Sequence, residues 1–320
     1  MTTLYPWLSE LWQEWQASLQ NGRFSNAAML TAKPGLGAEQ IVEHFSRAVM
    51  CSNYDHEACG FCHSCQLMQS GSHPDYHIVQ PEKEGKAISV DQIRQCNRQA
   101  QESSQLGGLR LFVIEPADSM NESAANALLK TLEEPSGSCM FLLVTHRSNG
   151  LLPTITSRCQ QWQVTPPNSE MVTQWISEQT SRSVPEYAAH LNSNAPLNTL
   201  QFVEQEKEQE YLKVEQSLIQ VVELSGDSLS LAKALANNPH ETLLWLWYLL
   251  TDAQKVHFSV NMPFFVPGAK RLSELVSYDI LYQQTKALSA LIDQLRQHSG
   301  LNSELLILDW LFRFNGETCS

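Results

Sequence analysis

The sequence predicts an α/β domain built on a parallel sheet, followed by a stretch that is almost entirely helical. Residues 27–31 form a strand pattern that leads into the glycine-containing segment 32–39 and then into a helix over 40–50. Strand, glycine-containing loop and helix in this order are typical of a phosphate-binding loop. Residues 140–144 are an unbroken apolar run, which suits a strand buried on both faces of a parallel sheet. Beyond Pro166-Pro167, helical patterns follow one another with little strand signal.

The other elements follow from apolar periodicity and from turn residues. Strands are expected over 76–80 and 109–115, and helices over 6–20 and 90–103. One more helix is expected because apolar residues recur at i, i+3, i+4 and i+7, at Ala125, Leu128, Leu129 and Leu132. Glu133, Glu134 and Pro135 end it, since proline cannot continue a helix. The segment 151–157 is then a short link.

Composition narrows the class of protein. The 320 residues are enough for two or three domains. A formal net charge of −13 argues against a surface that grips the DNA backbone by itself and favours protein partners. No signal peptide is expected in the Trp-rich, amphipathic beginning of the chain, and the longest apolar run, 243–250, is too short to cross a bilayer. We therefore expect a cytosolic (cytoplasmic) protein whose eight cysteines are reduced.

Four of these cysteines predict a structural zinc site. Cys51, Cys59, Cys62 and Cys65 have the spacing C-x7-C-x2-C-x2-C, and four thiolates close a tetrahedral Zn²⁺ site with no open position for catalysis. An iron–sulfur cluster is the rival, but the bacterial ferredoxin pattern would continue with x3-C-P, and Gln69 stands there instead. Four free buried cysteines are the third alternative.

The phosphate-binding loop lacks the residues that handle phosphate. Aligned with G-x-x-x-x-G-K-[ST], the segment from Ala32 to Glu39 has Ala32 for the first glycine, Ala38 for the lysine and Glu39 for the hydroxyl that binds Mg²⁺. Lys33 lies at the wrong place to substitute. The loop therefore predicts the fold but no productive ATP binding, because a carboxylate repels phosphate.

The motif NALLKTLEEP (126–135), the buried strand after it and the tripeptide Ser157-Arg158-Cys159 resemble the clamp-loader branch of the AAA+ proteins. The resemblance implies an AAA+ core over 1–165 with the cysteine module inserted at about 51–65, a helical lid over 166–207 and an all-helical collar over 208–320. It also implies that Arg158 is an arginine finger that reaches the ATP site of a neighbouring subunit, where such a charge accelerates hydrolysis by roughly 10³–10⁵. A solvated surface arginine is the alternative.

The resemblance places three other phosphate-handling positions of the family at Glu115-Pro116, at Thr145 and in the lid segment 194–197. Glu115-Pro116 stands where active members have the Walker B pair Asp-Glu, and proline cannot orient a water molecule. Thr145 matches the position that senses the γ-phosphate, and we expect it to serve packing or a local hydrogen bond. The lid segment 194–197, Asn-Ala-Pro-Leu, lacks the arginine that touches ATP in active members.

The resemblance implies a non-ATP-binding subunit of the clamp loader of bacterial DNA polymerase III. Its partners would be ATP-binding subunits of the gamma/tau type and a delta subunit in a hetero-oligomeric ring that loads the sliding clamp onto primed DNA, with no membrane involved. It would have no catalysis of its own, although it would belong to a DNA-directed DNA polymerase, a nucleotidyltransferase. An ATP-hydrolysing motor subunit and a zinc-dependent nucleic-acid adaptor are the alternatives.

For three further groups of residues we favour a structural or solvent-exposed role over a catalytic or binding one. His73 and Asp75 are expected to stabilise a turn rather than to form a catalytic pair. Arg94 and Arg98 are expected on a solvated helix face. The aromatic residues Trp245, Trp247 and Tyr248 are expected in the helical core rather than at an interface.

Overall fold

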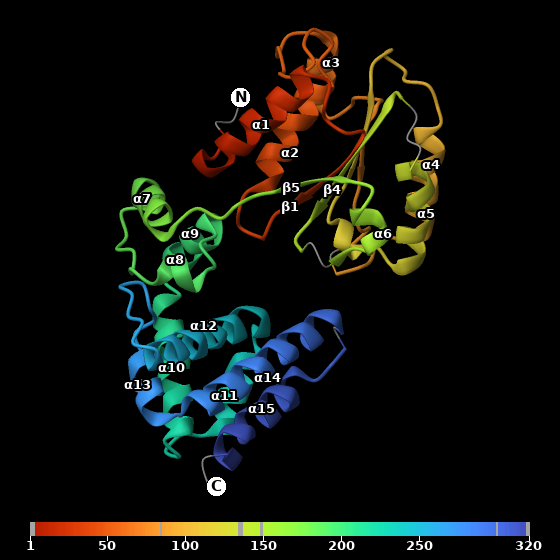
Figure 1. Ribbon diagram of the computed structural model, residues 1–320. Helices are drawn as coiled ribbons and strands as arrows, with labels where there is room; N and C mark the ends of the chain where they lie inside the picture. The colour runs from red at the N-terminus through yellow and green to blue at the C-terminus, as the bar shows by residue number, and fades with distance from the viewer. Residues whose placement is uncertain (1–3, 84, 134–136, 148–149, 299, 318–320) are drawn as a thin grey trace. The chain divides into compact units, whose positions relative to one another are not determined.

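The structure is a computed structural model that describes residues 4–83, 85–133, 137–147, 150–298 and 300–317 (Figure 1). The chain divides into two compact units, Met1–Pro166 and Pro167–Ser320. The further division into lid and collar at residue 207 stays a prediction. Helix lengths and hydropathies in the described ranges leave no helix able to span a membrane.

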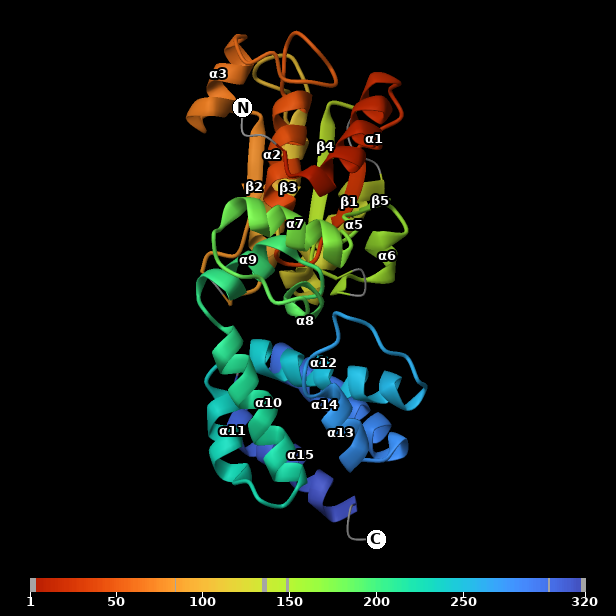
Figure 2. The ribbon, with the colours of Figure 1, turned by 90° about the vertical axis from the view of Figure 1, so that its left-hand side faces the viewer.

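The first unit contains the predicted parallel sheet. Its five strands lie in the order β2-β3-β4-β1-β5 (Figure 2), and every neighbouring pair is parallel. Their bounds are Ala27–Thr31 (β1), Tyr76–Val79 (β2), Arg110–Ile114 (β3), Cys139–Thr145 (β4) and Gln160–Gln163 (β5). The two central strands of the apolar core, β3 and β4, are buried along their whole length, as expected for strands covered on both faces.

Helices cover both faces of this sheet (Figure 1). The bounds are Pro6–Leu8 (η1), Ser9–Gln20 (α1), Ala38–Val49 (α2), His63–Ser70 (α3), Val90–Ala100 (α4), Ala117–Ser119 (η2), Glu122–Glu133 (α5) and Pro153–Thr156 (α6). α1 and α2 lie on one side, where the rings of Trp15 and Phe45 meet edge to face with centroids 5.0 Å apart. α4 and α5 pack on the other side around Met29, Phe112 and Phe141. The side chains of a strand alternate between these two layers.

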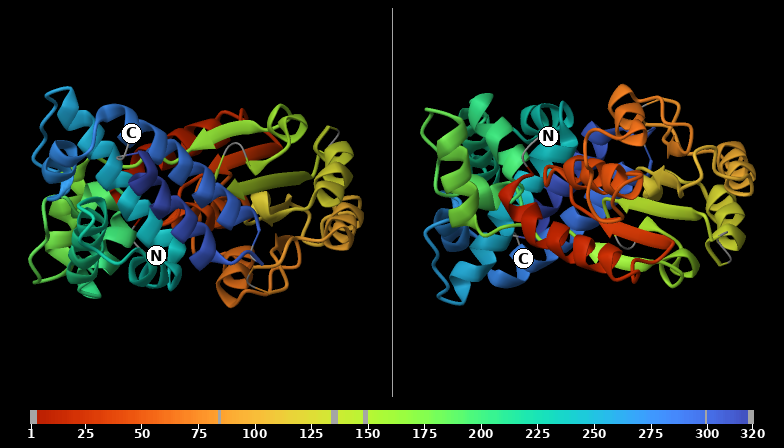
Figure 3. Two further views of the ribbon diagram at one scale, coloured as in Figure 1. Left: turned by 90° about the horizontal axis from the view of Figure 1, so that it is seen from below. Right: turned by 90° about the horizontal axis from the view of Figure 1, so that it is seen from above.

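The second unit contains helices and no strand in its described part. Its helices are Ser169–Gln179 (α7), Ala188–Leu191 (α8), Pro196–Glu204 (α9), Glu208–Val222 (α10), Ser228–Ala236 (α11), Pro239–His257 (α12), Ala269–Leu275 (α13), Tyr278–Gln297 (α14) and Ser303–Glu317 (α15). The helices α12, α14 and α15 lie side by side (Figure 3). One hydrophobic cluster joins residues from Val172 to Phe314, and Trp245 lies inside it, 1% exposed. The predicted core position of Trp245 is thus confirmed.

A buried polar network ties α8 to α12 within the second unit. Asp252 is fully buried, and both of its carboxylate oxygens lie 3.0 Å from Nε2 of His190. The carboxylate also accepts hydrogen bonds from the ammonium of Lys255 and from the backbone N–H of Val266. With these donors the buried charge is paired, as burial of a carboxylate requires.

Candidate functional site

Arg158 follows the short helix α6 at the surface of the first unit. Its guanidinium donates from Nε to Oε1 of Glu133 at 2.8 Å, and Nη2 donates to the same oxygen. Nη1 donates to the backbone carbonyl of Thr154 at 2.7 Å. Glu133 is the last residue of α5, so this ion pair joins the two halves of the motif that predicts an arginine finger.

The Arg158 side chain is not enclosed by its own chain. It is 33% exposed, and Glu133 is 47% exposed. A guanidinium has five N–H donors, and three of them have acceptors in the described part of the chain. One N–H on Nη1 and one on Nη2 are left for an acceptor outside the described residues. Such a pair of N–H groups matches two oxygens of a phosphate.

The segment from Ala32 to Glu39 links β1 to α2, as the sequence predicts. Gly35 and Gly37 have φ angles of 82° and 72°, which only glycine adopts without strain. The loop is tied inward by hydrogen bonds: Leu36 N–H donates to the Lys33 carbonyl at 3.3 Å, and the Leu36 carbonyl accepts from Trp7 Nε1 at 2.8 Å. The Leu36 side chain is fully buried.

Two carboxylates, those of Glu39 and Glu115, lie at or near this loop. Glu39 lies in the first turn of α2, where a carboxylate already satisfies the positive end of the helix dipole. Burial raises the pKa of the Glu115 carboxyl at the end of β3, and the nearby charge of Glu39 raises it further, while His146 lowers it. The carboxylates of Glu39 and Glu115 therefore interact electrostatically beside this loop.

The other positions compared with active AAA+ proteins have structural partners. Thr145 is fully buried, and its hydroxyl donates to the Arg147 carbonyl at 2.9 Å, which is the local hydrogen bond expected from the sequence. Asn194 accepts a hydrogen bond from the Ser169 hydroxyl at 2.9 Å, and Pro196 begins α9. The stretch therefore serves the start of a helix.

The four predicted metal ligands lie together. The Sγ atoms of Cys51, Cys59, Cys62 and Cys65 are all within 4.8 Å of one another. Backbone N–H groups point at these sulfurs: Cys62 N–H lies 3.4 Å from Cys59 Sγ, and Cys65 N–H lies 3.4 Å from Cys62 Sγ. A Zn–S bond of about 2.3 Å in a tetrahedron places sulfurs about 3.8 Å apart, so a small contraction would close the site.

The pKa values of two thiols in this cluster are shifted in opposite directions. Burial raises the pKa of Cys62, but N–H donors from Cys65 and Ser52 outweigh it and lower the pKa to about 6. Burial raises the pKa of Cys65 to about 12, with further raising contributions from Cys62 and Cys51. When several thiols lie close together without a cation, a thiolate at one position raises the pKa of its neighbour, which then keeps its proton. The donor set thus fits a soft divalent metal.

A Ser–His pair beside the cysteines resembles a nucleophile with its base, but its hydrogen bonds exclude that role. His73 Nε2 lies 2.7 Å from Ser64 Oγ, and both residues are buried. Nδ1 of His73 accepts the backbone N–H of Asp75 at 3.2 Å, so the ring proton lies on Nε2 and is donated to Ser64. Ser64 in turn donates to the Met50 carbonyl. His73 thus has a structural role, as expected, whereas the Asp75 carboxylate binds distant groups, from Ser104 to Arg110, rather than its own turn.

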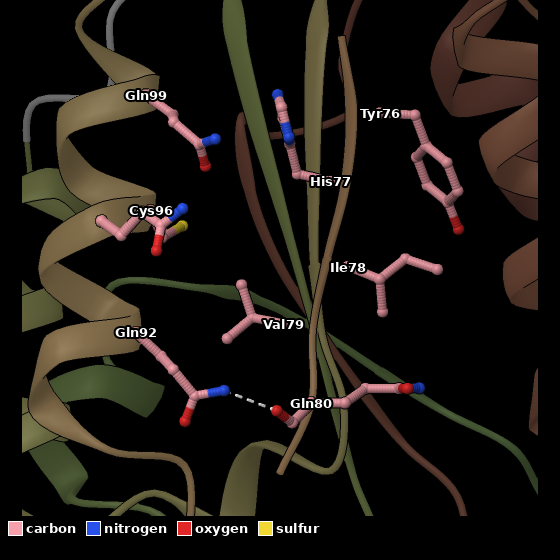
Figure 4. Close-up of a pocket in the computed structure, with 9 residues that line it drawn as sticks. Tyr76, His77, Ile78, Val79, Gln80, Gln92, Cys96 and Gln99 are labelled. Atoms are coloured by element: carbon pink, nitrogen blue, oxygen red, sulfur yellow. Dashed lines mark hydrogen bonds between the residues drawn. The ribbon is translucent and has the colours of Figure 1, made fainter. Parts of the chain in front are cut away.

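The sheet edge formed by β2 carries a groove of about 430 Å³ against α4. His77 and Val79 point toward Gln92, Cys96 and Gln99, and Gln92 donates to the Gln80 carbonyl at 2.7 Å (Figure 4). Burial raises the pKa of the Cys96 thiol to about 12, which keeps it protonated. Amide side chains predominate in the groove, and the ring of His77 lies 3.2 Å from Arg110 Nη2. Arg94 and Arg98 lie exposed on the same helix, as predicted.

The sheet, the loop after β1 and the helical second unit are those of an AAA+-like protein. Family models described as "DNA polymerase III, delta subunit" and "DNA polymerase III, delta subunit, C terminal" match residues 7–168 and 205–316. The chain belongs to the family of DNA polymerase III delta' subunits.

Similar proteins cover nearly the whole chain. DNA polymerase III subunit delta' of Escherichia coli is 34% identical, with 97% of this chain and 94% of that protein aligned. The protein of the same name from Haemophilus influenzae is 33% identical over 98% of this chain and 97% of its own length. Among solved structures, a DNA polymerase III gamma subunit-related protein of Thermotoga maritima covers 94% of this chain and 99% of its own, with 17% identity and a TM-score of 0.40.

The structure adds one residue to the site that sequence reasoning did not assign to it. Glu133 was expected only as part of the helix end, yet it is the partner of Arg158, 25 residues further along the chain. The only sequence signal is its place inside the NALLKTLEEP motif. Glu134 and Pro135, expected to end the same helix, lie outside the described residues.

Proposed function

We propose that this chain is a subunit that does not bind ATP itself and supplies Arg158 to the ATP site of a neighbouring clamp-loader subunit. Two observations carry the proposal. The exposed Arg158 guanidinium has two N–H donors without an acceptor among the described residues, and the phosphate loop has Ala38 and Glu39 at its lysine and hydroxyl positions. In this proposal Arg158 stabilises phosphate charge on the neighbouring subunit, and the segment from Ala32 to Glu39 does not hold a nucleotide.

The chemistry required of Arg158 is electrostatic. Charge builds on the oxygens of the transferred phosphoryl group in the transition state, and a planar, permanently charged guanidinium stabilises it with two parallel hydrogen bonds. The partners in this proposal are ATP-binding subunits of the gamma/tau type and a delta subunit in a hetero-oligomeric ring. ATP binding in that ring would open the sliding clamp and place it on primed DNA in the cytoplasm.

We further propose that the four cysteines hold a structural Zn²⁺. Cys51, Cys59, Cys62 and Cys65 supply the whole tetrahedral set, so the metal would join the start of α3 to the end of α2 and stabilise the insertion. The ion would act through the fold of the first unit only, because no ligand position is left for a water molecule.

The test is a reconstituted clamp loader that contains Arg158→Ala. DNA-stimulated ATP hydrolysis and clamp loading should fall by roughly 10³ if one neighbouring site dominates turnover, while the ring still assembles on gel filtration. Arg158→Lys should rescue little, because a lysine cannot place two donors side by side. Exposed Arg98→Ala is the matched control. An unchanged turnover with Arg158→Ala would reject the proposed role.

A second measurement addresses the nucleotide. Equilibrium dialysis of the isolated chain with ATP and Mg²⁺ should give no saturable binding at micromolar concentrations. Tight binding would instead support the alternative of an ATP-hydrolysing motor subunit.

A further inference from the structure

The hydrogen bonds of Arg158 leave one particular edge of its guanidinium free. Nε and Nη2 form the side edge of the group, and both donate to the same oxygen of Glu133. Nη1 donates to the Thr154 carbonyl. The unused N–H groups, counted over the described residues, are one on Nη1 and one on Nη2. The Arg158 side chain is therefore held through the Nε and Nη2 edge of its guanidinium, and both terminal nitrogens keep one N–H donor without an acceptor among the described residues.

We propose that Glu133 is a positioning residue that holds the Arg158 guanidinium in the orientation from which it reaches a phosphate of the adjoining subunit. This inference rests on the proposed function of Arg158. Glu133 does not touch the nucleotide in this proposal. It acts by fixing the rotamer of a long side chain before the partner arrives.

The location of Glu133 favours a role tied to Arg158. Glu133 is the last residue of α5, and a carboxylate at the C-terminal end of a helix is opposed by the helix dipole. A basic partner from elsewhere in the chain offsets this, and Arg158 is that partner. Because both side chains are partly exposed, their pairing contributes little to the stability of the fold. The variant without Glu133 should therefore fold.

Fixing the side chain matters because a flexible arginine has many rotamers to lose when it binds. A catalytic group that is displaced by about 1 Å can lose roughly 10²-fold in rate, and removal of an orienting partner typically costs about 10- to 100-fold where it has been measured at metal sites. We expect Glu133→Ala to lower the rate by about 10-fold, the smaller of these losses, because the hydrogen bond from Arg158 to the Thr154 carbonyl remains. If Glu133 instead competed with phosphate for Arg158, Glu133→Ala would raise the rate of ATP hydrolysis.

The experiment measures DNA-stimulated ATPase in the reconstituted ring with wild type, Glu133→Ala, Glu133→Gln, Arg158→Ala and the double variant. Glu133→Ala should lower kcat about 10-fold with KM for ATP unchanged, because the neighbouring subunit binds the nucleotide. Glu133→Gln keeps an acceptor oxygen of the same reach and should stay within about 3-fold of wild type. Glu122→Ala, an exposed acidic change on the same helix, is the control and should have no effect.

The double variant decides whether Glu133 acts through Arg158. In the Arg158→Ala background, Glu133→Ala should change nothing further, since coupled residues are not additive. A wild-type or faster rate for Glu133→Ala, a Glu133→Gln rate as low as that of Glu133→Ala, or an additive loss in the double variant would overturn the inference. A wild-type rate for Arg158→Ala would instead remove the proposed function itself, so the two failures are distinguishable.

Discussion

Replacing Asp75 with Asn should strongly destabilise the first unit, because it leaves a buried arginine without its main counter-charge. Asp75 and Arg110 are 0% and 1% exposed, and Asp75 Oδ1 lies 3.4 Å from Arg110 Nε. The carboxylate also accepts from Ser104 Oγ at 2.9 Å and from the backbone N–H groups of Gln105 and Leu106 at 2.9–3.0 Å. Each carboxylate oxygen faces at least one N–H group, which can only donate, so the NH₂ group of an asparagine would face a donor whichever way it turned.

Removing one partner of a buried ion pair lowers the free energy of unfolding by about 3–5 kcal/mol, and we expect a loss of this size for Asp75→Asn. The remaining carboxylate near Arg110 is Glu102, at 3.3 Å, and it is 63% exposed, so it cannot replace Asp75. Since one factor of ten corresponds to about 1.36 kcal/mol, amide hydrogen exchange of β3 should accelerate by about two to four powers of ten under conditions where exchange reports unfolding of the unit.

The same carboxylate predicts a dependence on pH. Burial alone would raise the pKa of Asp75, but the N–H groups of Gln105 and Leu106, the Ser104 hydroxyl and the Arg110 charge outweigh it and lower the pKa below its ordinary value. A lowered pKa means that the stabilisation is present above about pH 4, the unfolded value, and is lost as the pH falls through the folded value. The difference between wild type and Asp75→Asn should therefore shrink in acid.

Two further variants keep this prediction open to refutation. Ser104→Ala removes one of the hydrogen bonds and should cost about 1 kcal/mol, which is measurable even if Asp75→Asn does not fold. Asp91→Asn breaks an exposed ion pair with Arg94 and should change the free energy of unfolding by less than about 1 kcal/mol. Equal effects of Asp75→Asn and Asp91→Asn would refute the reasoning from burial.

Three other expected outcomes follow from the structure. Cys62→Ser should reduce bound zinc, measured by atomic absorption, from one equivalent per chain to less than half, whereas Cys96→Ser, outside the cluster, should keep it; equal zinc contents would contradict the ligand assignment. Ala38→Lys combined with Glu39→Thr removes a negative charge and adds a positive one at the start of α2. The affinity for ATP in a filter-binding assay should therefore rise, while hydrolysis stays absent. An unchanged affinity would mean that the conformation of the loop, rather than its charge, prevents binding. Asp252→Ala leaves His190 and Lys255 without their acceptor and should lower the free energy of unfolding of the second unit by about 2–4 kcal/mol in urea, and a loss below about 1 kcal/mol would show that the network is not stabilising.

The sheet was predictable wherever its strands are apolar. The run 140–144 lies inside β4, and the strand over 27–31 is β1 itself, because buried parallel strands carry a composition that solvent-exposed segments cannot have. β5 was not predicted, since Gln160–Gln163 has a single apolar residue, Trp162. That edge strand is fixed by packing of Trp162 against Trp15 and Phe24, and contacts so distant in sequence leave no local pattern.

The site was predictable to the extent that its residues are adjacent in sequence. The four cysteines lie between Cys51 and Cys65, so their spacing alone predicts that they are close together, which the structure confirms. The helix α3, which carries Cys65, was missed because its apolar periodicity is interrupted by the ligands themselves. Glu133 lies 25 residues before Arg158, and the partners of Asp75, from Ser104 to Arg110, lie 29 to 35 residues after it. They become neighbours only through the order of the strands, which no local pattern contains.

The central claim, that Arg158 acts on a nucleotide held by another subunit, is tested most directly by a photocrosslinker placed at this position. A benzoylphenylalanine at residue 158, in the assembled ring with ATP and Mg²⁺, should crosslink to the phosphate-loop peptide of the adjoining ATP-binding subunit, and mass spectrometry identifies that peptide. Crosslinks confined to this chain, for example to α5 around Glu133, in a fully assembled ring would contradict the account.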